Sequence, residues 1–109
     1  MNTGDDSRVF GDVGTKKILE NDRVRVWEVR LGPGEEGSVH RHTLDHLLIQ
    51  VLGDRIAVVP EPDSEGPFRD YFEADVIPGA VVAVPRGGVE RARNVGLQPY
   101  VEVVIEIKD

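Results

Sequence analysis

The three histidines of the chain, His40, His42 and His46, fall within seven residues of one another. Imidazole is the commonest metal ligand in proteins and the usual group for proton transfer near neutral pH. Side chains two positions apart point to the same face of a strand but to different faces of a helix. The Gly- and Pro-rich residues 32–37 argue against a helix just before the cluster. We therefore expect His40 and His42 to project side by side from a strand, with His46 arriving after a short turn.

Short apolar segments, rich in Val and Ile and bounded by Gly, Pro or Asp, must position these histidines. No segment shows a sustained helical period, and residues 60–67, with three prolines, are predicted to form a loop. The pattern predicts eight or nine short strands, and therefore an all-β sandwich or barrel. The predicted strands include residues 23–31, 46–52, 56–59, 69–74, 81–84, 89–95 and 101–107.

Two of these strands carry further information. Residues 23–31 alternate with a phase shift between Val26 and Trp27, which indicates either a bulge or burial of both faces. The last strand alternates most clearly. It places Val101, Val103, Ile105 and Ile107 on one face, and Glu102, Glu106 and Lys108 on the other.

Two residues outside the histidine cluster are candidates for the wall of a substrate pocket. Counting in twos from His46 places Gln50 on the inward face of its strand, where it either orients a substrate or makes a cross-strand hydrogen bond. Tyr71 follows the long Pro-rich loop and is expected near the mouth of the barrel.

The bulk properties exclude several classes of function. The chain has 109 residues, which suits one domain, and its net charge of −7 argues against binding to nucleic acids or anionic membranes. The absence of cysteine excludes disulfides and thiolate metal sites. No apolar run is long enough to span a bilayer and no signal peptide is recognisable, so we expect a soluble cytoplasmic protein. Residues 1–14 are expected to form a polar arm, and residues 15–109 the barrel domain.

The spacing of these residues resembles the two sequence motifs of the cupin superfamily. The first motif is a glycine, His-x-His, an acidic ligand and a second glycine, and it maps onto Gly34, His40, His42, His46 and Gly53. The second is a glycine, Pro-x-Gly, a histidine and an asparagine, and it maps onto Gly79, Pro85, Gly87, Glu90 and Asn94. The resemblance implies a double-stranded β-helix, or jelly-roll barrel. The four motif glycines are expected at turns, where a positive φ is cheap only for glycine.

The chain departs from the cupin pattern at two positions. His46 stands where cupins usually have the glutamate ligand, and Glu90 stands where they usually have the third histidine. A metal responds to ligand type and geometry, and not to sequence order. The resemblance therefore implies a site of three histidines and one glutamate, namely His40, His42, His46 and Glu90. The alternatives are a hydrogen-bonding role for His46 and a surface position for Glu90, beside Arg91 and Arg93.

Three functions are compatible with this pattern. The first is a metal-dependent enzyme of the dioxygenase, isomerase or lyase type, acting on a small organic molecule through a divalent Fe, Mn, Ni, Co or Zn ion. The second is a metal-free cupin that binds or senses a small molecule. The third is a structural or storage role. Because cupins commonly dimerise, the resemblance also implies a homodimer.

Overall fold

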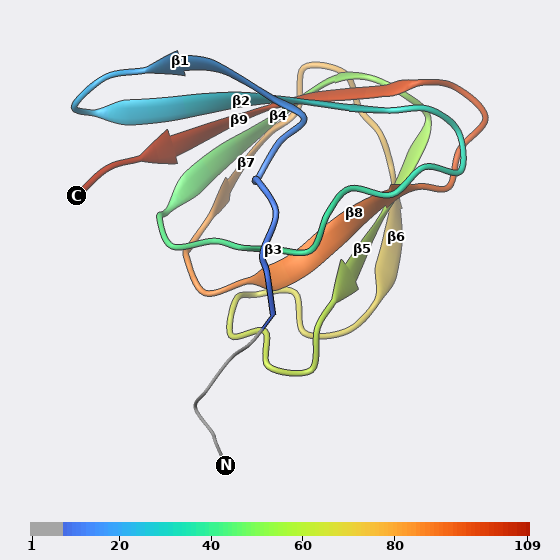
Figure 1. Cartoon of the computed structure of the whole chain (residues 1–109). Helices are drawn as coiled ribbons and strands as arrows, with labels where there is room; N and C mark the ends of the chain where they lie inside the picture. The colour runs from blue at the N-terminus through green and yellow to red at the C-terminus, as the bar shows by residue number, and fades with distance from the viewer. Residues whose placement is uncertain (1–7) are drawn as a thin grey trace.

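The computed structural model describes residues 8–109, which form nine strands and no helix. Two antiparallel sheets face each other, and residues 8–14 run past their open side (Figure 1). The five-stranded sheet has the order β1-β2-β9-β4-β7, and the four-stranded sheet has the order β3-β8-β5-β6. The strands are β1 (Lys16–Glu20), β2 (Val24–Leu31), β3 (His40–Arg41), β4 (His46–Leu52), β5 (Arg55–Pro60), β6 (Phe72–Asp75), β7 (Val81–Val84), β8 (Val89–Asn94) and β9 (Tyr100–Ile107).

The all-β class and the seven predicted strands are confirmed, with shifts of a few residues at their ends. One strand, β1, had no sequence signal. Its five residues are all exposed, and Ile18 and Leu19 are adjacent, so no apolar alternation marks it. It forms at the sheet edge by pairing with β2, with a register shift between Lys17 and Leu19. Since no helix occurs in the described part of the chain, none there can cross a membrane.

The phase shift in β2 is explained by burial of both of its faces. Val26 and Trp27 are both buried, and the pairing of β2 with β9 runs without a bulge from Val24 to Leu31. Trp27 belongs to the core between the sheets, whose buried members also include Val29, Leu31, Ile56, Val76, Tyr100 and Val104.

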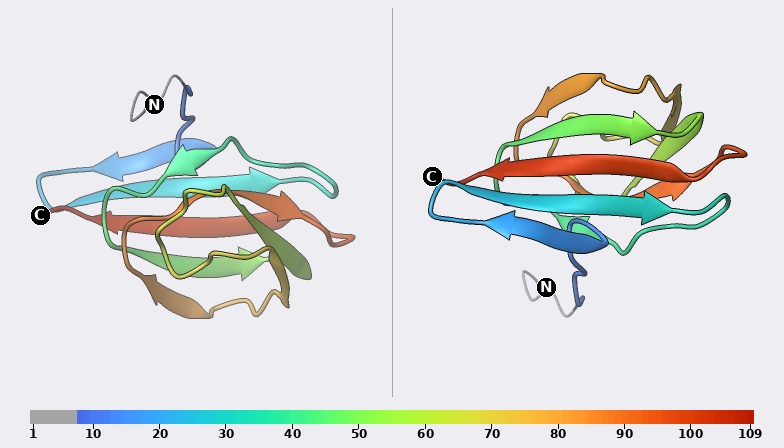
Figure 2. Two further views of the ribbon diagram at one scale, coloured as in Figure 1. Left: turned by 90° about the horizontal axis from the view of Figure 1, so that it is seen from below. Right: turned by 90° about the horizontal axis from the view of Figure 1, so that it is seen from above.

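The central strand β9 turns its polar face inward. Glu102 and Val104 line the space between the sheets, and Glu106 is 1% exposed. The apolar residues Val103, Ile105 and Ile107 have the opposite parity and lie on the outer face of the five-stranded sheet, which the right-hand view of Figure 2 looks onto. Two neighbours on this outer face, Val51 and Val81, are about half exposed, at 48% and 59%. The interior is therefore more polar, and the outer surface more apolar, than simple alternation predicts.

The motif glycines occupy the turn conformation that the sequence predicted. Gly34, Gly53, Gly79 and Gly87 have φ values of 83°, 134°, 90° and 115°. At Gly53 a side chain is excluded for a second reason, because an added Cβ would lie 2.9 Å from the Tyr100 ring. This close approach sets Tyr100 against the turn that ends β4.

The described part of the predicted arm, residues 8–14, contacts the barrel. The Gly11 amide donates a hydrogen bond to the Val39 carbonyl at 2.9 Å. Val13 packs against the core, and Asp12 and Val13 line the cavity between the sheets. The rest of the arm, residues 1–7, lies outside the described residues.

Candidate functional site

The strand pairing of the four-stranded sheet brings His40 and Glu90 together. They are direct partners in the β3–β8 ladder, so their side chains leave the sheet side by side. His42 follows β3 and is fixed by two main-chain hydrogen bonds, from its amide to the Gly88 carbonyl and from the Gly87 amide to its own carbonyl. Gly88 makes room for this arrangement, because an added Cβ would lie 2.6 Å from Glu90 Oε1 and 3.5 Å from His42 Cδ2.

His40, His42 and Glu90 each offer one ligand atom, and these atoms lie within 4.8 Å of one another. The two Nε2 atoms are 3.1 Å apart, and Glu90 Oε2 lies 3.9 Å from His42 Nε2. A carbonyl oxygen only accepts, so the contact of His40 Nδ1 with the Ser38 carbonyl at 2.9 Å places the ring proton on Nδ1. The lone pair of neutral His40 is thereby directed at the group, as metal-ligating histidines require. The donor set of two imidazoles and a carboxylate fits a divalent transition metal.

Burial sets the protonation states of this group. It lowers the pKa of His40, and it lowers the pKa of His42 to about 2. Burial also raises the pKa of Glu90 to about 7. His42 and Glu90 therefore do not form an ion pair near neutral pH, because His42 is uncharged there. A bound cation would favour the anionic form of Glu90 and remove the cost of its burial.

His46 lies behind His42 and is not part of the three-residue group. Its ring stacks on that of His42 with centroids 3.9 Å apart and an interplanar angle of 14°. His46 Nδ1 donates to the Leu44 carbonyl at 3.0 Å, which leaves the Nε2 lone pair free. His46 thus lies next to the site, on the opposite sheet. It is not one of the residues that line the cavity. Its role as a fourth ligand stays a prediction.

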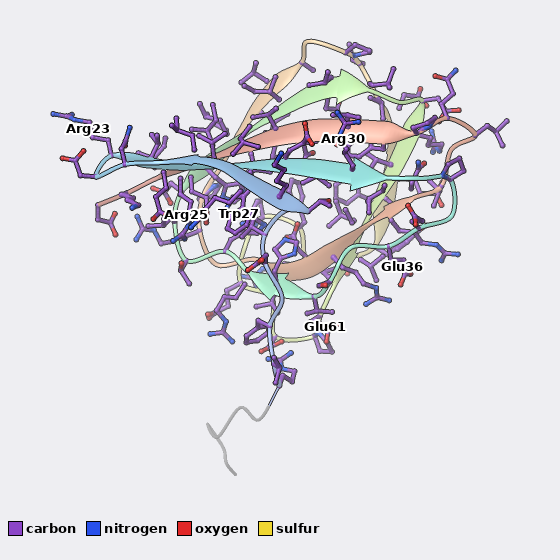
Figure 3. All side chains as sticks on the ribbon, turned by 45° about the horizontal axis from the view of Figure 1, so that its top comes forward. Arg23, Arg25, Trp27, Arg30, Glu36 and Glu61 are labelled. Carbon is purple, nitrogen blue, oxygen red and sulfur yellow. The ribbon has the colours of Figure 1, made fainter. Side chains whose placement is uncertain are left out.

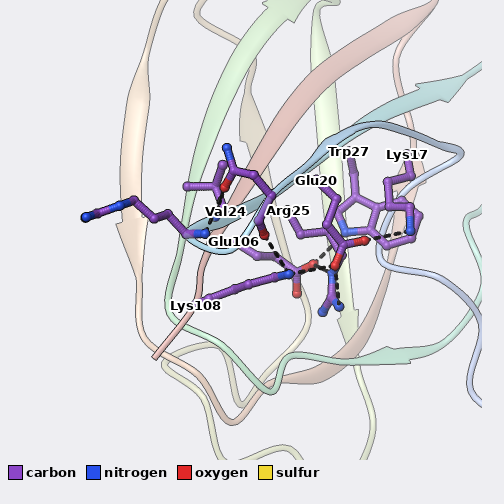
Figure 4. A network of polar contacts seen from close by, with 9 residues as sticks. Lys17, Glu20, Val24, Arg25, Trp27, Glu106 and Lys108 are labelled. Atoms are coloured by element: carbon purple, nitrogen blue, oxygen red, sulfur yellow. Dashed lines mark hydrogen bonds and ion pairs between the residues drawn. The ribbon is translucent and has the colours of Figure 1, made fainter.

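A buried carboxylate that was not singled out from the sequence, that of Glu106, lies beside His46. Glu106 is the β9 partner of His46 in the ladder. Its Oε1 accepts hydrogen bonds from Arg25 Nε at 2.7 Å and from Trp27 Nε1 at 2.6 Å, as Figure 4 shows. Arg25 and Trp27 extend from the inward side of β2, whereas Arg30 lies on its other side (Figure 3). Within residues 8–109, Glu106 Oε2 and His42 Nδ1 are the buried side-chain atoms without a hydrogen-bond partner.

The three-residue group opens onto a cavity of about 750 Å³ between the sheets. This volume is typical of sites for small organic molecules. Its middle is apolar, since core side chains from both sheets face it. The lining includes Val29, Leu31, Leu48, Ile56, Val58, Phe68, Phe72, Ala92 and Val104, together with His40, His42 and Glu90.

The two predicted wall residues differ in position. Gln50 lines the cavity, and its Oε1 accepts a hydrogen bond from the Ile77 amide at 3.0 Å. Phe72, and not Tyr71, lines the cavity, because successive residues leave an extended chain on opposite sides. Tyr71 is 49% exposed and donates its hydroxyl hydrogen bond to Glu73 at 2.6 Å.

Glu102 is the cavity residue that sequence reasoning missed. It is the β4–β9 partner of Gln50, and its Oε1 accepts a hydrogen bond from the Tyr100 hydroxyl. Burial raises the pKa of Glu102 to about 7, with a further contribution from the charge of Glu90. The signal was present in the sequence, because Glu102 lies on the one polar face of the most regular strand.

Comparisons with known proteins identify the fold. No family model matches the chain, and no curated protein matches it. Among solved structures, a cupin domain from Bordetella pertussis Tohama I is 24% identical with a TM-score of 0.70, over 91% of this chain and 100% of that one. An RmlC-like cupin with a double-stranded β-helix fold, from Methanocaldococcus jannaschii, is 16% identical with a TM-score of 0.66, over 93% and 90%.

A third similar structure is described as that of an enzyme. It is a cupin-superfamily sugar phosphate isomerase from Silicibacter pomeroyi, 23% identical with a TM-score of 0.55 over 80% of this chain. This chain spans 52% of that protein's length. The chain therefore has the cupin fold, a double-stranded β-helix, as the motif spacing predicted.

Proposed function

We propose that the protein is a small metal-dependent cupin enzyme acting on a small organic molecule, by dioxygenase, isomerase or lyase chemistry. The observation that supports this most directly is the His40–His42–Glu90 group, buried at one end of an apolar cavity. These three residues would hold one divalent ion, and His46 is proposed as the fourth ligand. When bound, the ion would act as a Lewis acid on a substrate oxygen or activate dioxygen.

The residues of the chain have defined tasks in this proposal. Hydrogen bonds to the Ser38 and Leu44 carbonyls keep the ring protons of His40 and His46 on Nδ1, so each Nε2 has a lone pair for the ion. The apolar middle of the cavity excludes water and binds the carbon skeleton of the substrate. Glu90, whose pKa burial raises to about 7, would be held anionic by the cation. One of the similar structures is named as a sugar phosphate isomerase of the cupin superfamily, which supports an enzymatic role for this chain.

The test is metal content, measured by mass spectrometry on protein purified without an affinity tag or chelator. We expect near-stoichiometric metal in the wild type and none in His42→Ala. Glu90→Gln should lose most of the metal, whereas Glu65→Gln, an exposed control outside the group, should keep it. His46→Ala tests the fourth ligand, and unchanged metal affinity in that variant would remove His46 from the site. Wild type that stays metal-free after reconstitution with Fe, Mn, Ni and Zn would contradict the proposal.

One observation favours a metal-free binding cupin as the second candidate. The His40 and His42 Nε2 atoms lie at 3.1 Å, the distance of a hydrogen bond from one neutral imidazole to the other. Such a pair is stable without an ion and would present a polar end to a bound molecule. This function predicts a wild type without metal and ligand binding that His42→Ala weakens.

A further inference from the structure

The cavity has a second polar end that the metal group does not use. Across the ladder, Glu102 pairs with Gln50, and the next inward pair is Leu48 with Val104. The apolar pair lies between Glu102 and the His46–Glu106 pair. Because inward residues along a strand are about 7 Å apart, Glu102 lies two such steps from the level of His46. The cavity is thus polar at both ends and apolar in the middle.

We propose that Glu102 and Gln50 form a recognition site for the ammonium group of an organic ligand. The inference rests on the proposed function for the other end of the ligand, which would bind at the metal group, and it names the substrate class as a small amine. The apolar middle would contact the carbon chain that joins the two ends.

The hydrogen bonding of Glu102 leaves it short of donors. Within the part of the chain that the structure describes, the Tyr100 hydroxyl donates to Oε1 and no donor reaches Oε2. Gln50 Oε1 already accepts a hydrogen bond from the Ile77 amide. A carboxylate in an apolar cavity with one neutral donor is costly to ionise, which agrees with its raised pKa of about 7. An ammonium group would supply both the donor and the charge.

The charge around the cavity favours a cation over an anion. Among the described residues Arg30 is the one basic residue of the lining, and its side chain lies on the other side of β2, where it is 63% exposed and paired with Glu28 at 2.7 Å. The acidic lining residues are Asp12, Glu35, Glu36, Asp75, Glu90 and Glu102. A phosphorylated or otherwise anionic head group would be repelled at this end, whereas an amine is attracted.

The experiment is an NMR titration of the metal-free protein at pH 8 with n-butylammonium chloride and, separately, with n-butanol of the same chain length. We expect the ammonium ion to bind at least about tenfold more tightly than the alcohol, because of a charge-assisted hydrogen bond. The amide resonances of Gln50, Tyr100 and Glu102 should shift. In the isosteric variant Glu102→Gln, the two affinities should become nearly equal.

Two control variants locate the effect. Glu36→Gln removes a lining carboxylate that is ion-paired with Arg91 and should keep the ammonium preference. Glu90→Gln should also keep it. Equal affinities in the wild type, a preference that survives Glu102→Gln, or a preference that disappears with Glu90 would each overturn the proposal. Metal content measured on the same Glu102→Gln sample should equal that of the wild type, so failure of the metal site and failure of the ammonium site give different results.

Discussion

Two carboxylates on the same face of β9, four residues apart, have opposite surroundings. Glu106 is 1% exposed and accepts hydrogen bonds from a guanidinium and an indole, the side chains of Arg25 and Trp27. Glu102 faces the cavity, and its donor is the neutral hydroxyl of Tyr100. A buried charge needs a partner of opposite charge, or it becomes neutral. Glu106 is therefore part of the structure, whereas Glu102 is available to a ligand.

The largest effect is expected when each carboxylate is removed in turn by mutation. Glu106→Ala removes the acceptor of Arg25 Nε and of the Trp27 indole. We expect a loss of about 3 kcal/mol in the free energy of unfolding, at the lower end for a broken buried ion pair because Arg25 is partly exposed. Glu102→Ala should cost less than about 1 kcal/mol, since one neutral hydrogen bond is lost. Urea denaturation of both variants measures this, and equal costs would show that the two carboxylates do not differ in role.

A second test uses pH. Burial raises the folded-state pKa of Glu102 from 4.5 to about 7. The protonated form is favoured in the folded state, so its contribution to stability is fully present below pH 4.5 and is lost as pH rises through 7. Between pH 5 and pH 8 the wild type should lose on the order of 2 kcal/mol relative to Glu102→Gln.

The comparison with the variant is necessary because the histidines act in the opposite direction. Burial lowers the pKa of His42 from 6.5 to about 2. The unfolded chain therefore binds a proton at this residue more readily than the folded protein, and the folded protein loses stability as pH falls below 6.5. Urea unfolding of wild type and Glu102→Gln across pH 5–8 isolates the glutamate. A difference in stability that stays constant with pH would place Glu102 in an environment as polar as water.

The smallest test concerns two tyrosines that each donate to a glutamate two residues ahead. Tyr100→Phe removes the buried donor to Glu102 and should cost about 1 kcal/mol. It should also raise the pKa of Glu102 further, because the hydroxyl stabilises the anion. Tyr71→Phe, which removes the exposed contact to Glu73, is the matched control and should change stability little. Carboxyl-detected NMR titration checks both variants, and an unchanged pKa of Glu102 in Tyr100→Phe would show that the buried hydrogen bond is weak.

Much of the fold was predictable because turns and strands leave local signals. The four motif glycines adopt the expected positive φ, and the spacing of His40 and His42 brings their rings into contact. Edge strand β1 was missed because pairing with β2, and not its own pattern, makes it a strand.

The site was less predictable than the fold, since the four predicted ligands are divided between the two sheets. His46 and Glu90 come from different sheets, and sequence spacing alone does not give the distance between them. Glu102 was missed for a different reason. An alternating strand normally turns its apolar face to the core, whereas in β9 the polar face lines a cavity. Tyr71 and Phe72 are adjacent, and a shift of one residue decides which of them faces inward.

The inverted faces of β9 have a consequence for folding. A slip of one residue against β2 and β4 would exchange the two faces, placing Val103 and Ile105 inside and both glutamates in water. Burial of apolar side chains alone would favour that misaligned register. The bonds from Arg25 and Trp27 to Glu106 are available in the native alignment, as is the packing of Tyr100 on Gly53. These contacts at the two ends of β9 therefore favour the native register over a misfolded chain whose interior would be more apolar and would have no cavity.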